Sequence, residues 1–374
     1  MLPELSESFN VSSAMLSSLS ASYFFAYAFA QIPVGLLIDR FGTHILLSLA
    51  CLTISIASFL FAYTDQIILA NYCRVFIGLG SAFAFVGCLK LAANWFPANK
   101  FGLIVGLTNL FGVLGAIIGG NPLAHAVDAF GWRNTMYCSA FLGLILTFLL
   151  YKIIRDGDYK KPPRLIDNTK LITKLNAVIR NKQSWLIALF AGGMIAPIVT
   201  YSELWGVSYI MNTYDLNRPA AAHITTLTFI GIAIGGPLIG WLSDYYRKRT
   251  VFMAMGLSGA LVSITLILFG PIMPLWFIAF LHMTFGFFTS SMLLCFSLNS
   301  ETTLPNIRAT TLAFTNSIIM LAGALLQTTS GYLLDYTSDN YNLSFVPLVC
   351  CYVLAFVCFK YIVETRCRFK DNCA

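Results

Sequence analysis

The chain has 374 residues, of which 58% are apolar, 14% aromatic and only 10% charged. Because about a quarter of the residues in a soluble domain are charged, this composition excludes an ordinary soluble protein and predicts an integral membrane protein. The formal net charge is +7. Nearly all of the basic residues lie near the ends of apolar runs or in the segments between them, so the net charge is a signal of membrane topology. We therefore expect a lipid bilayer as surroundings and no nucleic-acid partner.

Apolar runs long enough to cross a bilayer recur along the whole chain. A spanning helix needs about 20 apolar residues, and eleven runs come near this length. They cover residues 17–38, 44–63, 67–90, 101–121, 133–153, 184–211, 222–242, 250–270, 273–297, 308–334 and 343–363. The runs are continuously apolar and do not alternate with period two, which favours helices over a barrel. The sequence therefore predicts an all-α, polytopic membrane protein with about eleven transmembrane helices.

One charged segment divides these runs into five and six. Residues 155–183 carry acidic and basic side chains and the pair Pro162-Pro163, and such a segment is too polar to cross lipid. We therefore expect three parts: an N-terminal helix bundle at 1–154, a cytoplasmic linker at 155–183 and a C-terminal helix bundle at 184–374.

The Lys and Arg residues predict which loops face the cytoplasm. If the loop that contains Asp39 is cytoplasmic, twenty of the 23 basic residues lie on that side. Arg133 and Arg218 fall on the opposite side, and Arg74 falls inside a run. We expect no separate signal peptide, because no basic residue precedes the first run and that run is too long. The expected location is the bacterial inner membrane, which the chain crosses many times.

A glycine followed four residues later by an aspartate closes an apolar run twice. The two copies are Gly35-Leu-Leu-Ile-Asp39-Arg40-Phe-Gly42 and Gly240-Trp-Leu-Ser-Asp244-Tyr-Tyr-Arg247. They lie 205 residues apart, which predicts two related bundles in tandem, the arrangement of many secondary transporters. Ordinary tight turns between helices would be an alternative explanation.

These stretches resemble the major facilitator superfamily over nearly the whole chain. The first copy is similar to the loop between that family's helices two and three, and the second to the loop between helices eight and nine. Three further stretches agree with helix four, helix five and the loop before helix six: Arg74-Val-Phe-Ile-Gly78-Leu-Gly80, Gly112-xx-Gly115-xxx-Gly119-Gly120 and Phe130-Gly131-Trp132-Arg133. The resemblance implies two pseudo-symmetric bundles and transport by alternating access.

The resemblance also indicates a departure at the N-terminus. Since the Asp39 loop follows helix two in the family, the chain starts in the loop after helix one, and Pro3-Glu4-Leu5 with Phe9-Asn10 looks like that loop. We therefore expect the family's fold without its first helix. Either a start site placed too far downstream or a truly shortened gene would explain this.

In the family the first loop acts as the inner gate. The resemblance assigns this role to Gly35, Asp39, Arg40 and Gly42, and more weakly to Gly240, Asp244 and Arg247. The residue types fit the role, because glycine lets helices approach closely and suits a turn with positive φ. Charged side chains at the headgroup level can form charge-assisted hydrogen bonds between helices. Alternatively, the charges only fix the topology.

Two charged residues fall inside the apolar runs and are candidates for the substrate site. Arg74 and Glu203 each lie roughly 10 Å from the external face at 1.5 Å per residue. A charge at such depth is costly enough to need a partner or a water-filled cavity. The two side chains could meet across the cavity or bind opposite ends of a zwitterion, and Glu203 could carry a proton. A structural ion pair and a side chain that reaches the interface are alternatives.

Neutral polar residues complete the expected substrate-binding set. Tyr23, Tyr27 and Gln31 recur every four residues and share one face of the first run, although each could also bond to a neighbouring helix. The other members lie on four further runs and are Asn109, Trp205, His282 and Asn316. Trp205 is equally compatible with an anchor at the membrane interface. A lone histidine such as His282 is more often a packing residue whose polar atoms are satisfied.

We expect a monomeric secondary transporter of a small organic solute, with protons as the coupling ion. The sequence contains no phosphate-binding loop, nucleophile elbow or zinc motif, so we expect no enzyme, no metal and no cofactor. Glu203-Leu-Trp205-Gly206-Val207 and Gly331-Tyr-Leu-Leu-Asp335 resemble bacterial phagosomal-type nutrient transporters and, more distantly, lysosomal dipeptide carriers. That finer resemblance implies amino acids, short peptides or nucleosides. A truncated, non-transporting membrane sensor or assembly protein is the alternative function.

Overall fold

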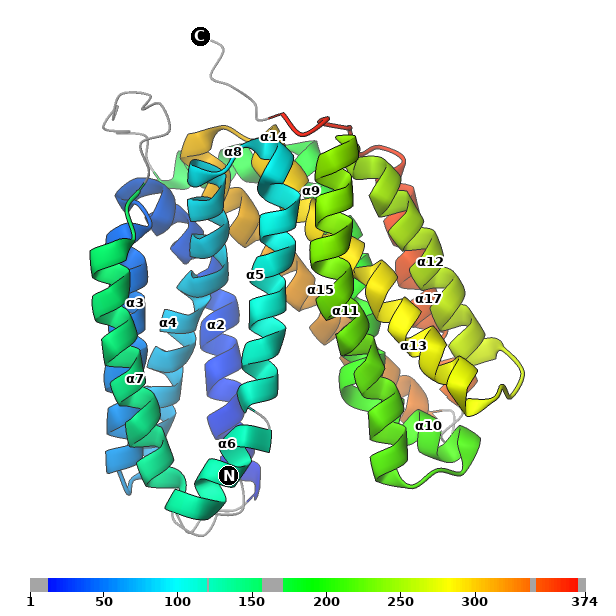
Figure 1. Ribbon diagram of the computed structural model, residues 1–374, viewed down its shortest axis with the longest axis horizontal. Helices are drawn as coiled ribbons and strands as arrows, with labels where there is room; N and C mark the ends of the chain where they lie inside the picture. Colours follow the sequence, from blue (N-terminus) through cyan, green and yellow to red (C-terminus); the bar gives the residue numbers. More distant parts are fainter. Residues whose placement is uncertain (1–12, 120, 157–170, 337–340, 369–374) are drawn as a thin grey trace. The chain divides into compact units, whose positions relative to one another are not determined.

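The computed structural model describes the backbone of residues 13–119, 121–156, 171–336 and 341–368. The expected external loop before residue 13, Gly120 and most of the expected linker lie outside this part. Every regular element of the described residues is a helix (Figure 1). This confirms the all-α fold class predicted from the apolar runs.

Contacts divide the chain into two compact units. Unit 1 contains Met1–Trp95, Leu114–Leu175 and Asn306–Ala313, and unit 2 contains Phe96–Val113, Asn176–Pro305 and Phe314–Ala374. Each unit thus holds one short piece of the other half of the sequence, and each piece contains the start of a long helix. The expected domain boundaries at residues 154 and 184 stay a prediction.

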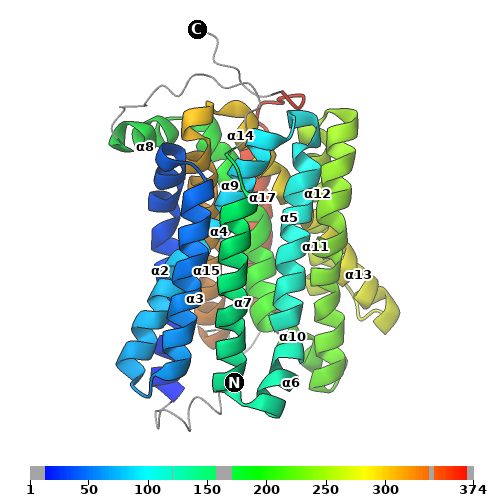
Figure 2. The same ribbon diagram turned by 60° about the vertical axis from the view of Figure 1, so that its left-hand side comes forward.

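Unit 1 is a bundle of long helices. Its helices are α2 (Ser13–Phe41), α3 (His44–Tyr63), α4 (Ile67–Trp95), α6 (Asn121–Phe130) and α7 (Trp132–Ile153), and the short α8 (Leu171–Ile179) begins in it. α4 packs against both α2 and α3, and α7 runs along α3 (Figure 2). At one end of the bundle the ring of Phe61 lies 5.9 Å from that of Trp132, so the starts of α4 and α7 share a small apolar core.

Unit 2 contains the remaining long helices. They are α5 (Ala98–Gly119, as far as Val113), α9 (Lys182–Pro197), η1 (Ile198–Trp205), α10 (Gly206–Tyr214), α11 (Arg218–Tyr246), α12 (Arg249–Phe269), α13 (Leu275–Thr289), η2 (Ser290–Leu293), α14 (Leu294–Thr302), η3 (Pro305–Ile307), α15 (Arg308–Tyr336, from Phe314), α16 (Tyr341–Ser344) and α17 (Val346–Phe359). α11 packs along α13, α12 packs along α13, and α9 packs along α17.

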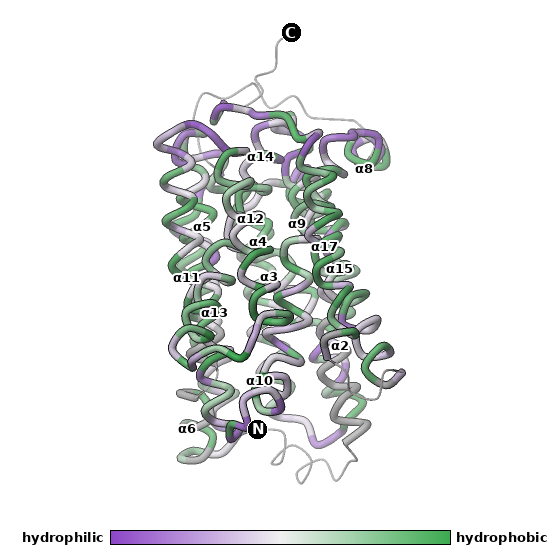
Figure 3. The backbone as a smooth tube through the Cα atoms, turned by 90° about the vertical axis from the view of Figure 1, so that its right-hand side faces the viewer, coloured by the Kyte–Doolittle hydropathy of each residue, from purple (hydrophilic) through white to green (hydrophobic). Residues whose placement is uncertain are grey.

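The helices match the apolar runs that the sequence predicted. Nine helical stretches of the described residues are long and apolar enough to cross a membrane. The two other predicted runs, 17–38 and 343–363, correspond to the 29-residue α2 and the 14-residue α17. Hydrophobic residues dominate the middle of the helices, and hydrophilic residues gather toward their ends and in the loops (Figure 3). The chain is therefore an integral, multi-pass membrane protein.

One predicted run is irregular in its centre. The run at 184–211 is an α-helix only as far as Pro197, then forms the π-helix η1 over Ile198–Trp205, and returns to α-helix in α10. Pro197 lacks a backbone N–H, which weakens the regular hydrogen-bond ladder. The Nε2 of Gln327 donates a hydrogen bond of 2.9 Å to the carbonyl oxygen of Val199 and so satisfies a backbone group in η1. π-helical turns are frequent at functional sites.

Two pairs of glycines bring α5 and α11 into backbone contact. A Cβ added to Gly106 would lie 2.6 Å from the nitrogen of Pro237, and one added to Gly240 would lie 2.6 Å from the carbonyl carbon of Gly102. Each helix thus presents two small residues four positions apart, as in closely packed membrane helices. The sequence analysis placed the small-residue stripe of this helix at Gly112 and Gly115. At these two glycines an added Cβ would have no neighbouring atom within 4 Å, so they make no close helix contact.

We predict that Gly106→Ala destabilises the protein and Gly112→Ala does not. The added methyl at position 106 meets backbone atoms that cannot rotate away, and overpacking of this kind costs about 1–3 kcal/mol. At position 112 the methyl has open space, and alanine favours a helix by roughly 1 kcal/mol over glycine. Melting temperatures of the purified variants in detergent test this. Equal melting temperatures for the two variants would contradict it.

Candidate functional site

Asp39 caps the start of another helix. Its side chain is fully buried. Oδ1 accepts hydrogen bonds from Lys90 Nζ at 2.8 Å and from the backbone N–H of Ala309 at 3.1 Å. Oδ2 accepts bonds from the N–H and the hydroxyl of Thr310 at 2.7 and 2.8 Å. Because Ala309 and Thr310 lie in the first turn of α15, the carboxylate satisfies N–H groups that have no partner inside that helix.

The neighbouring residues of the first loop have distinct positions. Gly35 allows α2 to approach α15, because a Cβ there would lie 2.7 Å from the Cβ of Ala313. Gly42 has φ of +87°, which favours glycine, and the carboxylate of Asp156 lies against it. Arg40 is exposed, and its guanidinium lies 5.3 Å from the centroid of the Phe41 ring.

Asp244 makes the corresponding contact in unit 2. Its Oδ1 accepts a hydrogen bond of 3.1 Å from the N–H of Gly102, and its Oδ2 accepts one of 2.7 Å from the N–H of Leu103, both near the start of α5. A side chain at position 102 would obstruct this, since an added Cβ would lie 3.0 Å from the Asp244 carboxylate. The two copies of the repeat therefore share one function in the fold: each aspartate binds backbone N–H groups near the start of another helix.

A buried arginine completes the Asp244 network. Arg249 is fully buried and donates to Asp244 Oδ1 at 2.5 Å, to Glu301 Oε1 at 2.7 Å and to the carbonyl oxygen of Ala98 at 2.8 Å. A further bond of 3.1 Å reaches the hydroxyl of Ser243. A buried guanidinium needs such partners, because an unpaired charge removed from water is very costly.

Lys90, Arg249 and Glu301 belong to these networks, but the sequence analysis did not select them. All three are charged residues within a few positions of the end of an apolar run, and this is the signal that could have identified them. Arg247 was expected to assist the gate. The structure places it on the surface as the residue that ends α11, with a left-handed backbone of φ 53°. Arg249, two residues later, contacts Asp244 instead.

The segment after α17 closes over the Asp244 network. The hydroxyl of Thr365 donates to Glu301 Oε2. Glu364 accepts hydrogen bonds from the N–H and the hydroxyl of Thr250 at 2.8 and 2.7 Å, and so caps the start of α12. Partial burial alone would raise the pKa of the Glu364 carboxyl, but these bonds and one from the N–H of Arg366 hold that pKa below its ordinary value.

Burial raises the pKa of the Cys367 thiol to about 12, so the thiol stays protonated.

The expected binding residues of α2 and α4 lie on facing helices. Tyr23 and Tyr27 stack with ring centroids 6.2 Å apart. Gln31 is fully buried, and within the described residues neither atom of its amide has a hydrogen-bond partner. Arg74 lies one turn before Gly78, where α4 packs closely against Ala26 of α2. Arg74 therefore lies on the side of α4 that faces α2.

Arg74 carries a charge without an acidic partner in the described part of the chain. Its guanidinium carbon lies 5.7 Å from the centroid of the Phe61 ring, and its Nε has no hydrogen-bond partner there. Among the described residues no carboxylate forms an ion pair with it. A membrane-embedded cation of this kind is well suited to receive an anion.

The π-helix η1 contains both expected binding residues of its span, Glu203 and Trp205. Glu203 is exposed, whereas Trp205 is half-buried and its Nε1 is buried without a described hydrogen-bond partner. The indole ring lies 3.9 Å from the position that a Cβ would take at Gly331 of α15. The buried hydroxyls of Thr200 and Ser202 likewise have no partner in the described chain. This turn thus concentrates polar groups inside an apolar span.

The other expected binding residues occupy different surroundings. His282 is fully buried, and its ring nitrogens lie 3.1 Å from the hydroxyl of Tyr201 and 2.7 Å from the carbonyl oxygen of Ile278. Both of its polar atoms are therefore engaged within the protein. Asn109 is half-buried, with an Nδ2 that has no partner among the described residues, and Asn316 is buried. In the described part of the chain no group of three His, Cys, Asp or Glu side chains could hold a metal ion.

Comparison with known proteins identifies the family. The sequence profile of the Major Facilitator Superfamily matches residues 1–209 and 204–366. The chain belongs to the major facilitator superfamily. It is therefore a secondary transporter of small solutes and not an enzyme, as the sequence predicted.

Several relatives from bacteria are similar to this superfamily member. The uncharacterized transporter YybO of Bacillus subtilis (strain 168) is 25% identical, with 98% of this chain and 89% of that protein covered. The hexuronate transporter of the same organism is also 25% identical, with 70% and 63% covered. The probable galactarate/D-glucarate transporter GarP of Escherichia coli (strain K12) is 21% identical, with 96% and 88% covered.

A solved structure confirms the superfamily's fold. The Major Facilitator Superfamily transporter FucP in its outward conformation matches with a TM-score of 0.78 at 14% identity, over 97% of this chain and 93% of that one. The finer resemblance to phagosomal-type nutrient transporters and lysosomal dipeptide carriers is wrong. The relatives named for a substrate are named for hexuronate, galactarate/D-glucarate, sulfoacetate or nitrite, among others, and none of these is an amino acid, a peptide or a nucleoside. Two short stretches were too little sequence to distinguish branches of one superfamily. The absence of the family's first helix stays a prediction.

We predict that Glu364→Gln lowers the melting temperature of this transporter at neutral pH and that the difference from the wild type disappears in acid. The folded-state pKa of Glu364 lies below the ordinary value of 4.5. Its stabilising contribution is therefore complete above that value and is lost as the pH falls through the folded-state pKa. Loss of a helix cap costs roughly 1 kcal/mol.

The matched control is Asp65→Asn. This carboxylate forms a surface pair with Arg133, and such pairs contribute little to stability. Melting temperatures in detergent between pH 3.5 and pH 8, a range chosen to bracket about 4.5, test the prediction for both variants. A destabilisation by Glu364→Gln that does not change with pH would contradict it.

Proposed function

We propose that this superfamily member transports a small organic anion, of the sugar-acid class, by alternating access and with protons as the coupling ion. The proposal rests on Arg74, a cation inside a membrane span that has no acidic partner among the described residues. A positive charge in this position attracts a carboxylate more strongly than a neutral sugar. It also gives no advantage to a nucleoside, which carries no negative charge.

The polar residues of α2 fit the remainder of such a substrate. Tyr23, Tyr27 and Gln31 recur every four residues, so they lie along one face of α2. Gln31 offers an amide donor and an amide acceptor, both without a described partner. Phenol and amide groups are suited to bind the hydroxyls of a polyhydroxylated acid. We assign the carboxylate of the solute to Arg74 and its hydroxyls to these three residues.

The names of two relatives support this substrate class. One is a hexuronate transporter and the other a probable galactarate/D-glucarate transporter, and both substrates combine carboxylates with several hydroxyls. Amino acids and short peptides, which the sequence analysis favoured, also carry a carboxylate, but they add an ammonium group. A zwitterion would need a carboxylate partner for that ammonium group in addition to Arg74, whereas a sugar acid would not.

In this proposal Glu203 carries the coupling proton. It is an exposed carboxyl inside a candidate span and lies within the irregular turn η1, where Trp205 and two buried hydroxyls supply further polar groups. FucP of Escherichia coli is a fucose:proton symporter, so proton coupling occurs among proteins of this fold. His282 serves packing instead, because both of its ring nitrogens are engaged.

The Asp39 and Asp244 networks serve as the inner gate in the proposed mechanism. Asp39 and Asp244 make hydrogen bonds to the starts of α15 and α5. In this mechanism those bonds break when the transporter changes conformation. The basic residues near these loops favour a position on the cytoplasmic side of a bacterial inner membrane. We further propose that the transporter functions as a monomer.

We predict that Arg74→Gln strongly reduces uptake of glucuronate or galactarate. Loss of a charge-assisted hydrogen bond to a carboxylate costs about 1.5–3 kcal/mol, which corresponds to roughly a 10- to 150-fold rise in the half-saturating concentration. Arg74→Lys keeps the charge but loses the planar fork and should retain partial uptake. Uptake of the labelled acids into membrane vesicles measures both effects.

Arg133→Gln is the control for loss of an arginine, because Arg133 is a partly exposed residue paired with Asp65. It should transport like the wild type. Amino acids and dipeptides are tested in the same vesicles as competitors. Stronger competition by an amino acid than by glucuronate would overturn the sugar-acid proposal. Absence of uptake of any solute would favour the alternative of a non-transporting membrane sensor.

We predict that Glu203→Gln abolishes accumulation driven by an imposed proton gradient but preserves exchange of solute between the two sides. The amide resembles the protonated carboxyl and cannot release a proton, so it uncouples without blocking binding. Counterflow with preloaded vesicles measures exchange. Asp65→Asn, which alters an exposed carboxylate, should leave both activities intact. Unchanged proton-driven uptake by Glu203→Gln would remove this residue from the mechanism.

A further inference from the structure

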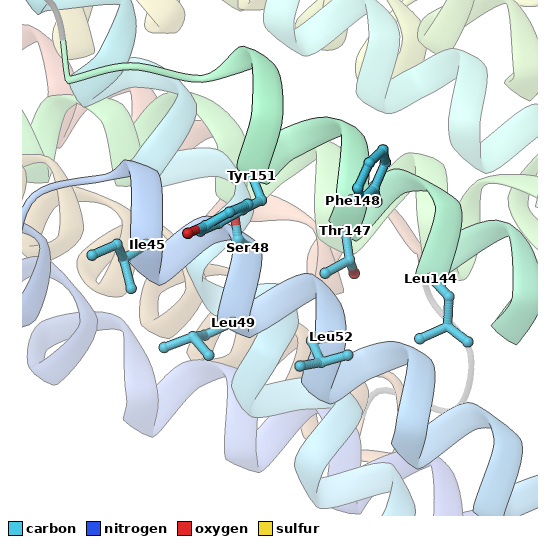
Figure 4. Close-up of a pocket in the computed structure, with 8 residues that line it drawn as sticks. All are labelled: Ile45, Ser48, Leu49, Leu52, Leu144, Thr147, Phe148 and Tyr151. Atoms are coloured by element: carbon cyan, nitrogen blue, oxygen red, sulfur yellow. The ribbon is translucent and has the colours of Figure 1, made fainter.

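A long apolar furrow runs between α3 and α7 in unit 1. It consists of two hollows of about 320 and 340 Å³ that share Leu144. The first is lined by Ile45, Ser48, Leu49, Leu52, Leu144, Thr147, Phe148 and Tyr151 (Figure 4), and the second by Ser55, Ile56, Phe59, Leu60, Tyr137, Ala140, Phe141 and Leu144. We refer to these residues together as the α3/α7 furrow. None of them belongs to the networks or the substrate residues described above.

The furrow lies on an outward-facing surface. Of the residues in an 18-residue apolar stretch of α7, only 6% are buried, whereas the corresponding share is 28–72% in the other candidate spans. In a multi-pass membrane protein such a surface meets lipid. The two helices approach closely at Gly143, because an added Cβ there would contact the hydroxyl of Ser55. The furrow is therefore a fixed feature of two tightly packed helices.

A second protein helix fits this surface poorly. Membrane helices associate through small residues that let their backbones approach. The glycine in the middle of α7, Gly143, is already used against α3. Between Phe141 and Leu149 the exposed residues of α7 are all phenylalanine, leucine or isoleucine. Flexible hydrocarbon chains can fill a furrow with such irregular walls.

One end of the furrow carries positive charge. Lys152 is exposed, and its Nζ lies 5.7 Å from the centroid of the Phe148 ring, which lines the first hollow. Arg155 follows and is exposed as well, with its carbonyl oxygen bound to Trp95 Nε1 at 2.8 Å. The tyrosine hydroxyl of Tyr151 adds a hydrogen-bond donor at this end (Figure 4).

The acidic residue nearby, Asp156, is engaged by the start of α3 and, among the described residues, forms no ion pair with Lys152 or Arg155. Asp156 uses its Oδ1 to accept the backbone N–H groups of Thr43 and His44 at 2.8 and 3.1 Å, and so caps the start of α3. His44 also faces Tyr151: its ring stacks on the phenol at 5.3 Å, and its Nε2 lies 2.8 Å from the carbonyl oxygen of Tyr151. Lys152 and Arg155 form no ion pair with a described carboxylate.

We propose that the α3/α7 furrow binds one phospholipid with an anionic headgroup, with an acyl chain in the first hollow and the phosphate at Lys152, Arg155 and Tyr151. The first hollow extends over residues 45–52 of α3, or about 10 Å at 1.5 Å per residue. This length lies within one leaflet, which is roughly 15 Å thick. The hydrocarbon walls receive the chain, and the basic residues at the mouth select the headgroup.

Native mass spectrometry of the purified transporter tests this site with two lipids of identical acyl chains, phosphatidylglycerol and phosphatidylcholine. The wild type should retain one phosphatidylglycerol more tightly than phosphatidylcholine. Lys152→Gln should weaken phosphatidylglycerol about fivefold, the effect of one basic residue near an anionic lipid surface, and leave phosphatidylcholine unchanged. Thr147→Trp, which fills the first hollow, should reduce retention of both lipids.

Lys360→Gln is the matched control. Lys360 ends α17, and its Nζ lies 4.9 Å from the centroid of the Phe356 ring, so it has the same local arrangement as Lys152 but lies outside the α3/α7 furrow. It should retain phosphatidylglycerol like the wild type. Equal retention of the two lipids by the wild type, or equal effects of Lys152→Gln and Lys360→Gln, would overturn the proposal. A dimer that Thr147→Trp dissociates, with no retained lipid, would assign the furrow to a second copy of the chain.

Discussion

The fold depends on two aspartates that bind backbone N–H groups near the starts of other helices. Asp39 reaches the first turn of α15, and Asp244 reaches Gly102 and Leu103 of α5. Ala309 and Thr310 lie in the first turn of α15, where an N–H group has no acceptor inside the helix, and away from water such a group costs several kcal/mol. A carboxylate meets this need and also interacts favourably with the positive end of the helix dipole. The glycine one turn earlier in each copy of the repeat permits the required close approach.

The two networks differ in how they compensate the charge of the aspartate. Asp39 forms an ion pair with Lys90. Asp244 forms an ion pair with Arg249, and Arg249 forms a second ion pair with Glu301. Glu301 also accepts a hydrogen bond from Thr365, in the segment after α17. Removal of one member of a fully buried charge network leaves another charge unpaired, which is strongly destabilising. The second network is therefore the more rigid, and a conformational change that opens it must move several groups together.

A stable fold requires that every buried charge has a partner, whereas the proposed substrate site requires a charge that is left for the solute. In the networks every charge has a partner, whereas Arg74 has none among the described residues and η1 contains several polar atoms without one. Unsatisfied groups of this kind lower stability, and a protein retains them where a ligand supplies the missing partner. Residues whose polar groups all have protein partners hold helices together. Residues whose polar groups have no described partner are available to bind a solute.

The sequence alone determined the class, the helices and the repeated loop. Continuous apolar runs define membrane helices because the length of a span is fixed by the bilayer, and Gly35-xxx-Asp39 recurred as Gly240-xxx-Asp244 because both copies perform the same contact. The sequence could not identify Lys90, Arg249 and Glu301 as partners, since these contacts join residues up to 52 positions apart. It also missed the π-helix η1 and the close contact at Gly106. These features depend on which helices lie side by side, and only the tertiary structure decides that.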